Sequence, residues 1–127
     1  MEIKLSSVMV NDQEAALAFY TEVLGFEKKQ DIPFGDDRWL TVVSPDGPDD
    51  MELLLEPMGF PPARTYQKAL FEAGIPLTAF AVSDVRSECE RLVELGVVFT
   101  TEPTNAGSTI IAVFEDTCGN LIQLFQE

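Results

Sequence analysis

Residues 10–26 read VNDQEAALAFYTEVLGF, and their pattern predicts a strand that passes into a helix. Apolar side chains recur there on one helical face, at Ala16, Leu17, Tyr20, Val23 and Leu24. Asn11 and Glu14 have the spacing of a capping box, and Gly25 is a residue type at which helices end. We therefore expect a helix over Gln13–Leu24, directly after a first strand.

One order of elements, a strand, a helix and three further strands, occurs in each half of the chain. In the first half, we expect strands at Ile3–Val10, Phe26–Gln30, Trp39–Ser44 and Met51–Glu56. In the second half, we expect strands at Leu77–Val82, Val97–Thr100, Thr109–Glu115 and Leu121–Gln126, with a helix over Val85–Leu95. Asp12 and Asp84 are as far apart as Gly47 and Gly119, which supports an internal repeat. The sequence predicts an α+β fold of two βαβββ modules.

The chain of 127 residues is long enough for one domain. We place the first module at residues 1–57, the second at 76–127 and a linker at 58–75. Gly59-Phe60-Pro61-Pro62 is expected to be an irregular loop, and Ala63–Ala73 a short helix. Neither module can bury both its helix face and its sheet alone, so the two are expected to share a core or to pair with another copy.

Charge and composition restrict the partners. Asp and Glu number 22 against 8 Lys and Arg, a net charge of −14, so a nucleic acid backbone would be repelled. The charge either serves solubility alone or favours cationic ligands. No apolar run approaches the roughly 20 residues of a membrane span, and no export signal is recognisable, so we expect a cytoplasmic protein.

Histidine is absent, which removes a common metal ligand and proton-transfer group. Cys89 and Cys118 are predicted to be thiols. Cys89 lies on the apolar stripe of the second helix and is expected to be inert. Cys118 lies in a turn, where a side chain can be exposed to solvent. No phosphate-binding loop and no Ser-His-Asp set occurs in the sequence.

Several stretches resemble the vicinal oxygen chelate superfamily, which includes glyoxalase I, extradiol dioxygenases and bleomycin-binding proteins. The stretches that carry the resemblance are Val10-Asn11-Asp12, Ala16-Leu17-Ala18-Phe19-Tyr20, Leu24-Gly25-Phe26, Met51-Glu52-Leu53, Val82-Ser83-Asp84-Val85, Leu95-Gly96-Val97 and 116–124. The resemblance implies that the two modules form a curved mixed sheet around a cavity, usually in a homodimer.

The resemblance also identifies the positions of metal ligands. Metal-dependent members take four ligands, usually His or Glu, from the first and the last strand of each module. These positions are Leu5 and Glu52 in the first module and Leu77 and Gln123 in the second. One carboxylate and one amide do not make a transition-metal site, so we expect neither a metal nor another cofactor.

The same positions predict the lining of a pocket. Strand alternation adds neighbours on the same faces, and aromatic residues are candidates for stacking. The predicted ligand-binding residues are Leu5, Ser7, Phe34, Trp39, Glu52, Leu54, Glu56, Phe60, Leu77, Ala79 and Gln123. Two alternatives stay open: Glu52 is a solvated strand residue rather than the polar centre of the pocket, and Trp39 belongs to the core rather than to the ligand site.

Three functions are compatible with this pocket. The first is a metal-independent binding protein for an amine-bearing or aromatic small molecule. The second is a metal-free lyase or isomerase in which Glu52, with a pKa raised by apolar neighbours, acts as general base. The third, a glyoxalase-like or dioxygenase-like metalloenzyme, is disfavoured by Leu5 and Leu77.

Overall fold

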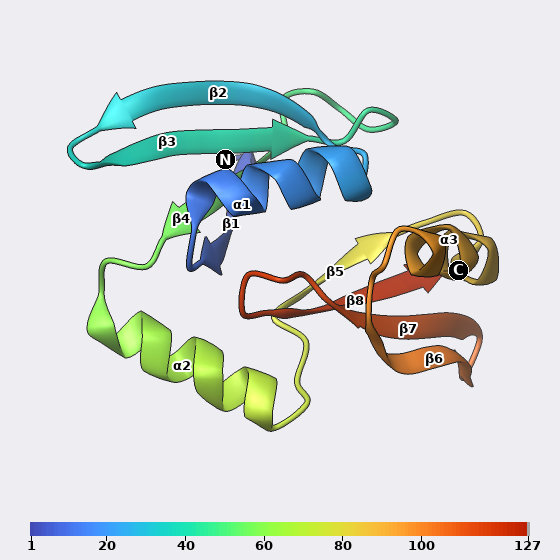
Figure 1. The fold of residues 1–127 in the computed structure, drawn as a ribbon. Helices are drawn as coiled ribbons and strands as arrows, with labels where there is room; N and C mark the ends of the chain where they lie inside the picture. The colour runs from blue at the N-terminus through green and yellow to red at the C-terminus, as the bar shows by residue number, and fades with distance from the viewer. Residues whose placement is uncertain (127) are drawn as a thin grey trace. The chain divides into compact units, whose positions relative to one another are not determined.

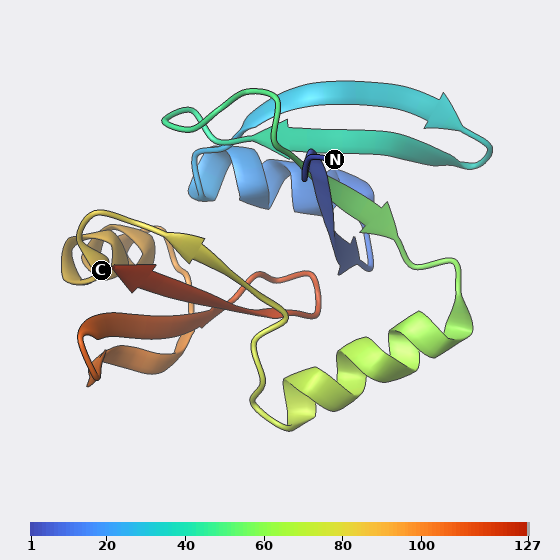
Figure 2. The same ribbon diagram turned by 180° about the vertical axis from the view of Figure 1, so that it is seen from behind.

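The computed structural model describes residues 1–126 and divides into two compact units, Met1–Arg64 and Thr65–Glu127. The first unit contains β1 (Leu5–Val10), α1 (Gln13–Ala18), its π-helical continuation η1 (Phe19–Val23), β2 (Glu27–Phe34), β3 (Asp37–Val43) and β4 (Glu52–Pro57). Next come α2 (Pro61–Glu72), β5 (Thr78–Ala81), α3 (Val85–Glu94), β6 (Phe99–Ala106), β7 (Thr109–Glu115) and β8 (Leu121–Gln126). Figure 1 shows these elements, and Figure 2 shows them from behind. The predicted α+β fold with two βαβββ modules is confirmed.

Each unit contains a four-stranded mixed sheet. The strand order is β1-β4-β3-β2 in the first unit and β5-β8-β7-β6 in the second. In each sheet the first and the last strand of the module pair in parallel, as β1 with β4 and β5 with β8, and the other pairs are antiparallel. Equivalent positions in the two modules therefore have equivalent neighbours.

The core of the first unit lies between its sheet and α1, which covers one face of that sheet (Figure 1). Val8, Leu40 and Leu55 on the strands are fully buried, as is Tyr20 on the helix. Each such side chain contributes about 1.5–3 kcal/mol through the hydrophobic effect. In the second unit, the buried side chains of α3 and its sheet include Val85, Cys89, Leu92, Phe114 and Ile122. Val85, Cys89 and Leu92 belong to the stripe predicted for this helix, whereas Leu95, predicted as its last member, is exposed because it lies beyond the end of α3.

Both module helices begin after an aspartate that caps the first turn. Asp12 accepts a hydrogen bond from the amide of Ala15 at 3.0 Å, and Asp84 accepts one from the amide of Ser87 at 3.1 Å. A carboxylate at this position satisfies a helix donor that otherwise has no partner. Asp12 is thus the cap, whereas the capping box predicted a start at Asn11.

The edge strands are longer than the sequence pattern predicts. The strand expected at Phe26–Gln30 continues to Phe34, and the strand expected at Val97–Thr100 starts at Phe99 and continues to Ala106. Pro33 and Pro103 lie within the extensions. Because β2 and β6 are edge strands, a proline can direct its ring nitrogen away from the ladder without removing a hydrogen bond.

The start of α2 also differs from the expectation. Pro61 and Pro62 form its first turn instead of an irregular loop, and the helix ends at Glu72, close to the predicted Ala73. Proline is tolerated in the first turn because amides there have no partner within the helix. Within residues 1–126, no helix combines the length and the apolarity that a membrane crossing requires.

The turn between β7 and β8 is buried. The Asp116 carboxylate, which is fully buried, accepts hydrogen bonds from the amides of Cys118 at 2.8 Å and Asn120 at 3.0 Å. Gln67 of α2 closes the turn by donating to the carbonyl of Cys118 at 3.2 Å and to Asn120 Oδ1 at 3.0 Å. The expectation that Cys118 is open to exposure is therefore wrong, because Cys118 is fully buried.

Candidate ligand-binding site

One face of the first sheet carries most of the predicted pocket residues. Strand register places Leu5 beside Glu52, Ser7 beside Leu54, and Leu54 beside Thr41. Along each strand, these residues alternate with buried residues on the opposite face of the sheet, which α1 covers. We call this surface the open face; it consists of Leu5, Ser7, Met9, Gln30, Ile32, Phe34, Trp39, Thr41, Glu52, Leu54 and Glu56.

The open face exposes large apolar side chains next to the carboxylates of Glu52 and Glu56. Leu5 is 44% exposed, Ile32 is 52% exposed and Phe34 is 70% exposed, whereas Trp39 is half-buried. An exposed apolar surface with a polar centre is typical of a surface that a ligand or a partner covers.

Glu52 is held in place by two neighbouring strands. Its Oε1 atom accepts hydrogen bonds from Gln30 Nε2 at 2.5 Å and from Thr41 Oγ1 at 2.7 Å. Thr41 Oγ1 in turn accepts from the amide of Gln30 at 3.1 Å, where a β-bulge interrupts the register of β2. Thr41 is fully buried, so its hydroxyl is fixed in this position.

The second oxygen of the Glu52 carboxylate, Oε2, accepts no hydrogen bond from any described residue. The carboxylate is half-buried, and its Oε1 atom is already used by Gln30 and Thr41. Glu52 therefore offers one fixed oxygen as an acceptor on the open face.

These hydrogen bonds also determine the charge of Glu52. Donation from Gln30, then from Thr41, lowers the pKa of the Glu52 carboxyl below its ordinary value, because both donors favour the ionised form. Partial burial raises this pKa and nearby Lys29 lowers it, both more weakly. The expectation of a raised pKa from apolar neighbours is therefore wrong.

The other predicted positions divide into two groups. Leu77, Ala79 and Gln123 belong to the second unit, where strand register places Ala79 beside Gln123 and the Leu77 amide donates to the carbonyl of Leu121 at 2.9 Å. Phe60 lies between β4 and α2, 68% exposed and outside the sheet. Ala79, rather than Leu77, thus occupies in the second sheet the place of Leu5 in the first.

The residues beside Glu52 and Gln123 are relevant to metal binding. Their neighbours across the parallel strand pairs are Leu5 and Ala79, whose side chains carry no donor atom. In the described part of the chain, no three His, Cys, Asp or Glu side chains lie together as a metal site requires. These positions do not match a site with four His or Glu ligands, and metal independence itself stays a prediction.

Sequence reasoning missed Gln30 and Thr41, although both shape the site. Gln30 reaches Glu52 because it lies opposite Thr41 in the β2–β3 pair, and the sequence alone does not give this register. The alternation of β3 did contain a signal for Thr41, because it lies two residues after Trp39 and therefore shares its face.

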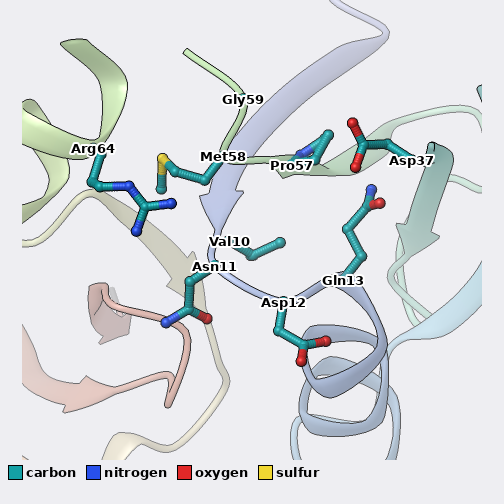
Figure 3. A pocket seen from close by; sticks show the side chains of 9 residues that line it. All are labelled: Val10, Asn11, Asp12, Gln13, Asp37, Pro57, Met58, Gly59 and Arg64. Atoms are coloured by element: carbon teal, nitrogen blue, oxygen red, sulfur yellow. The ribbon is translucent and has the colours of Figure 1, made fainter. Parts of the chain in front are cut away.

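A pocket lies at the carboxyl ends of β1 and β4, and Figure 3 shows it from close by. Its volume is about 310 Å³, and it is lined by Val10, Asn11, Asp12, Gln13, Asp37, Pro57, Met58, Gly59 and Arg64. The sequence analysis did not predict this pocket, since its walls come from four separate segments of the chain.

Comparison with known proteins identifies the relatives of this chain. It is 57% identical over 127 residues to the uncharacterized protein YurT of Bacillus subtilis (strain 168), with all of both chains covered. The crystal structure of UcmS2 is similar with a TM-score of 0.85 and 33% identity, over 98% of this chain and 97% of that one. TnmS3, an antibiotic binding protein from Streptomyces sp. CB03234, is similar with a TM-score of 0.78 and 34% identity, over 99% of this chain and 95% of that one.

A family model describes almost the whole chain. The model of the Glyoxalase/Bleomycin resistance protein/Dioxygenase superfamily matches residues 3–124, which include all eight strands except the end of the last. The two βαβββ modules, each with parallel first and last strands, agree with this match. The chain therefore belongs to the Glyoxalase/Bleomycin resistance protein/Dioxygenase superfamily.

Proposed function

We propose that the protein binds a small molecule on the open face of its first sheet, without a metal, and that the ligand carries an amine and an aromatic or apolar group. The observation that carries this proposal is the Glu52 carboxylate, whose Oε1 accepts two hydrogen bonds while Oε2 accepts none. A fixed carboxylate oxygen beside exposed apolar side chains suits an ammonium group attached to an apolar body.

The charge of Glu52 favours binding over acid-base catalysis. A general base in an enzyme usually has a pKa near the working pH, whereas hydrogen bonds from Gln30 and Thr41 lower the pKa of Glu52. The same lowered pKa keeps the carboxylate ionised at neutral pH, as salt-bridge formation with an amine requires. The metal-free lyase or isomerase is therefore the weaker candidate.

Two further observations support a binding function. TnmS3 is described as an antibiotic binding protein, and this chain resembles it over nearly its full length. The net charge of −14 favours a cationic ligand over an anionic one. A homodimer and a cytoplasmic location remain part of the proposal.

The experiment compares 4-phenylbutylamine with 4-phenylbutan-1-ol, which have similar shape but differ in charge. Trp39 is the single tryptophan, so its indole N–H signal in a ¹H–¹⁵N spectrum reports on the open face. We expect the amine to shift this signal saturably and to bind at least tenfold more tightly than the alcohol. Glu52→Gln should remove this preference, while Glu102→Gln, at an exposed glutamate on β6, should retain it.

Equal affinity for amine and alcohol, or an unchanged preference in Glu52→Gln, would contradict the role of Glu52. Metal independence is tested separately, by thermal unfolding with excess nickel, zinc, manganese or iron(II). A metal at one hundred times its dissociation constant would add about 2.7 kcal/mol of stability, and we expect no such gain. A gain that Glu52→Gln abolishes would overturn metal independence.

A further inference from the structure

The pocket at the carboxyl ends of β1 and β4 lies within the first unit and does not use Glu52. The lining contains three charged side chains: Arg64 of α2, Asp37 at the start of β3, and Asp12 before α1. Figure 3 shows the guanidinium group of Arg64 on the side of Asn11 and Met58, and the carboxylate of Asp37 on the opposite side, near Pro57.

Two of these groups, Arg64 and Asp37, are available to a ligand. Among residues 1–126, neither the Arg64 guanidinium nor the Asp37 carboxylate takes part in an ion pair or a side-chain hydrogen bond. Two other arginines are paired, Arg38 with Asp31 and Glu14 and Arg91 with Glu88, whereas Arg86, which lies outside the pocket, is in no ion pair among the described residues. Arg64 and Asp37 are therefore the positive and the negative group of the pocket that make no side-chain bond within the described chain, whereas the second carboxylate, Asp12, caps α1.

The polar groups between them are already used by the fold. Gln13 donates to the carbonyls of Arg38 at 2.7 Å and Leu55 at 2.8 Å, and its Oε1 accepts from the amide of Arg38 at 3.0 Å. Asp12 caps α1 through its Oδ1 atom. These bonds hold the wall of the pocket in shape, and they leave Arg64 and Asp37 as the groups that select a ligand by charge.

The overall charge of the protein restricts the class of ligand. A plain anion at Arg64 would be repelled by a chain of net charge −14, and a plain cation would leave Arg64 unused. A zwitterion satisfies both groups and is itself neutral. We propose that this pocket binds a small zwitterion, with its carboxylate at Arg64, its ammonium group at Asp37 and its carbon chain against Val10, Pro57 and Met58.

The expected affinity is modest. Ion pairs at exposed positions contribute about 0–1 kcal/mol each, and both Arg64 and Asp37 are exposed. The pocket volume of about 310 Å³ is at the lower end of ligand sites, so an amino acid or a molecule of similar size fits its chemistry. We therefore expect dissociation constants in the millimolar range.

The test is a ¹H–¹⁵N titration of the full chain with glycine, 4-aminobutyrate and 6-aminohexanoate. Butyrate and butylamine serve as probes with a single charge on the carbon chain of 4-aminobutyrate. At least one zwitterion should shift the amide signals of Asn11, Gly59 and Arg64 saturably, and butyrate and butylamine should bind about two- to fivefold more weakly, because each lacks one of the two ion pairs. The absence of saturation with all three zwitterions would overturn the proposal, as would equal binding of a singly charged probe.

Matched variants assign the contacts. Arg64→Gln and Asp37→Asn should each weaken binding about two- to fivefold, as the loss of one exposed ion pair implies. Arg86→Gln and Asp36→Asn, at exposed positions outside the pocket lining, should leave it unchanged. Glu52→Gln should also leave it unchanged, which separates this site from the open face. Binding that survives both Arg64→Gln and Asp37→Asn, or that is lost in Glu52→Gln, would place the ligand elsewhere and refute the assignment.

Discussion

At the scale of single residues, Glu52 shows how hydrogen-bond partners determine the character of a carboxyl group. Its apolar sequence neighbours Leu53 and Leu54 predict a desolvated group with a raised pKa, but Gln30 and Thr41 donate to the ionised form and lower it. Two donors that are distant in the sequence thus outweigh the neighbours along the strand.

Replacement of the hydroxyl donor should reverse part of this effect. We expect Thr41→Val to raise the pKa of Glu52, because the ionised carboxylate then loses one of its two donors. The pKa is measured from the side-chain carboxyl ¹³C shift during a pH titration. Thr101→Val, in the second unit, is the control and should leave the pKa of Glu52 unchanged. An unaltered pKa in Thr41→Val would show that the hydroxyl does not stabilise the charge.

Arg38 links three elements of the first unit. Its guanidinium donates to Asp31 at 2.9 and 2.7 Å and to Glu14 at 2.5 Å. Arg38 lowers the pKa of Asp31 to about 2, mainly through these hydrogen bonds. A lowered carboxyl pKa in the folded state stabilises it above the unfolded pKa, and this stabilisation is lost as the pH falls.

Arg38→Met should therefore change the acid side of the stability profile. In the unaltered protein, the contribution of Asp31 is complete above about pH 4 and disappears towards about pH 2. In Arg38→Met this part of the pH dependence should be absent, as measured by urea unfolding at several pH values. Arg91→Met, which removes a pair within α3, is the control. An identical pH dependence in Arg38→Met and the unaltered protein would contradict the assignment.

At the scale of elements, the contact of α2 with the β7–β8 turn depends on Gly119. This residue has φ +97°, and a Cβ atom there would lie 2.8 Å from Oε1 of Gln67, which is buried. Gly119→Ala should therefore destabilise the protein through backbone strain of about 1–3 kcal/mol and through the clash with Gln67.

A matched glycine separates these two effects. Gly107 has φ +65° with nothing within 4 Å of an added Cβ atom, so Gly107→Ala adds strain without a clash. We expect Gly119→Ala to lower the free energy of unfolding, measured in urea, by more than Gly107→Ala. Gln67→Ala in the Gly119→Ala background should cost less than Gln67→Ala alone, because there the substitution also removes the clash. Equal effects of the two glycine variants would refute the clash.

At the scale of the whole molecule, the pattern of exposed surfaces favours self-association. Both sheets have open edges, and large apolar side chains such as Phe34 and Val98 are 70% and 56% exposed. We predict a homodimer, twice the 14.0 kDa of one chain, in sedimentation at micromolar concentration. Because the net charge of −14 opposes association, added salt should strengthen the dimer. A monomer at every salt concentration would contradict this prediction.

The sequence by itself determined the repeated modules. The helices start at Gln13 and Val85 as predicted, and the stripe residues Val85, Cys89 and Leu92 are buried. These features depend on neighbours within a few residues, so local spacing is enough to predict them. Strand alternation also placed Leu5 with Ser7 on one face and Glu52 with Leu54 and Glu56 on one face, and the register joins these two sets.

Only the tertiary structure decided the properties that depend on contacts between distant segments. Prolines in β2 and β6 are tolerated because these strands are at sheet edges, and edge position is not a property of the strand's own sequence. Gln30 on β2 reaches Glu52 on β4 across the intervening β3, and its hydrogen bond lowers the pKa of the carboxyl. Arg64 lines one pocket together with the ends of β1 and β4. Hydrogen bonding and burial act through space, so a pKa or a pocket follows from the fold and not from the order of residues.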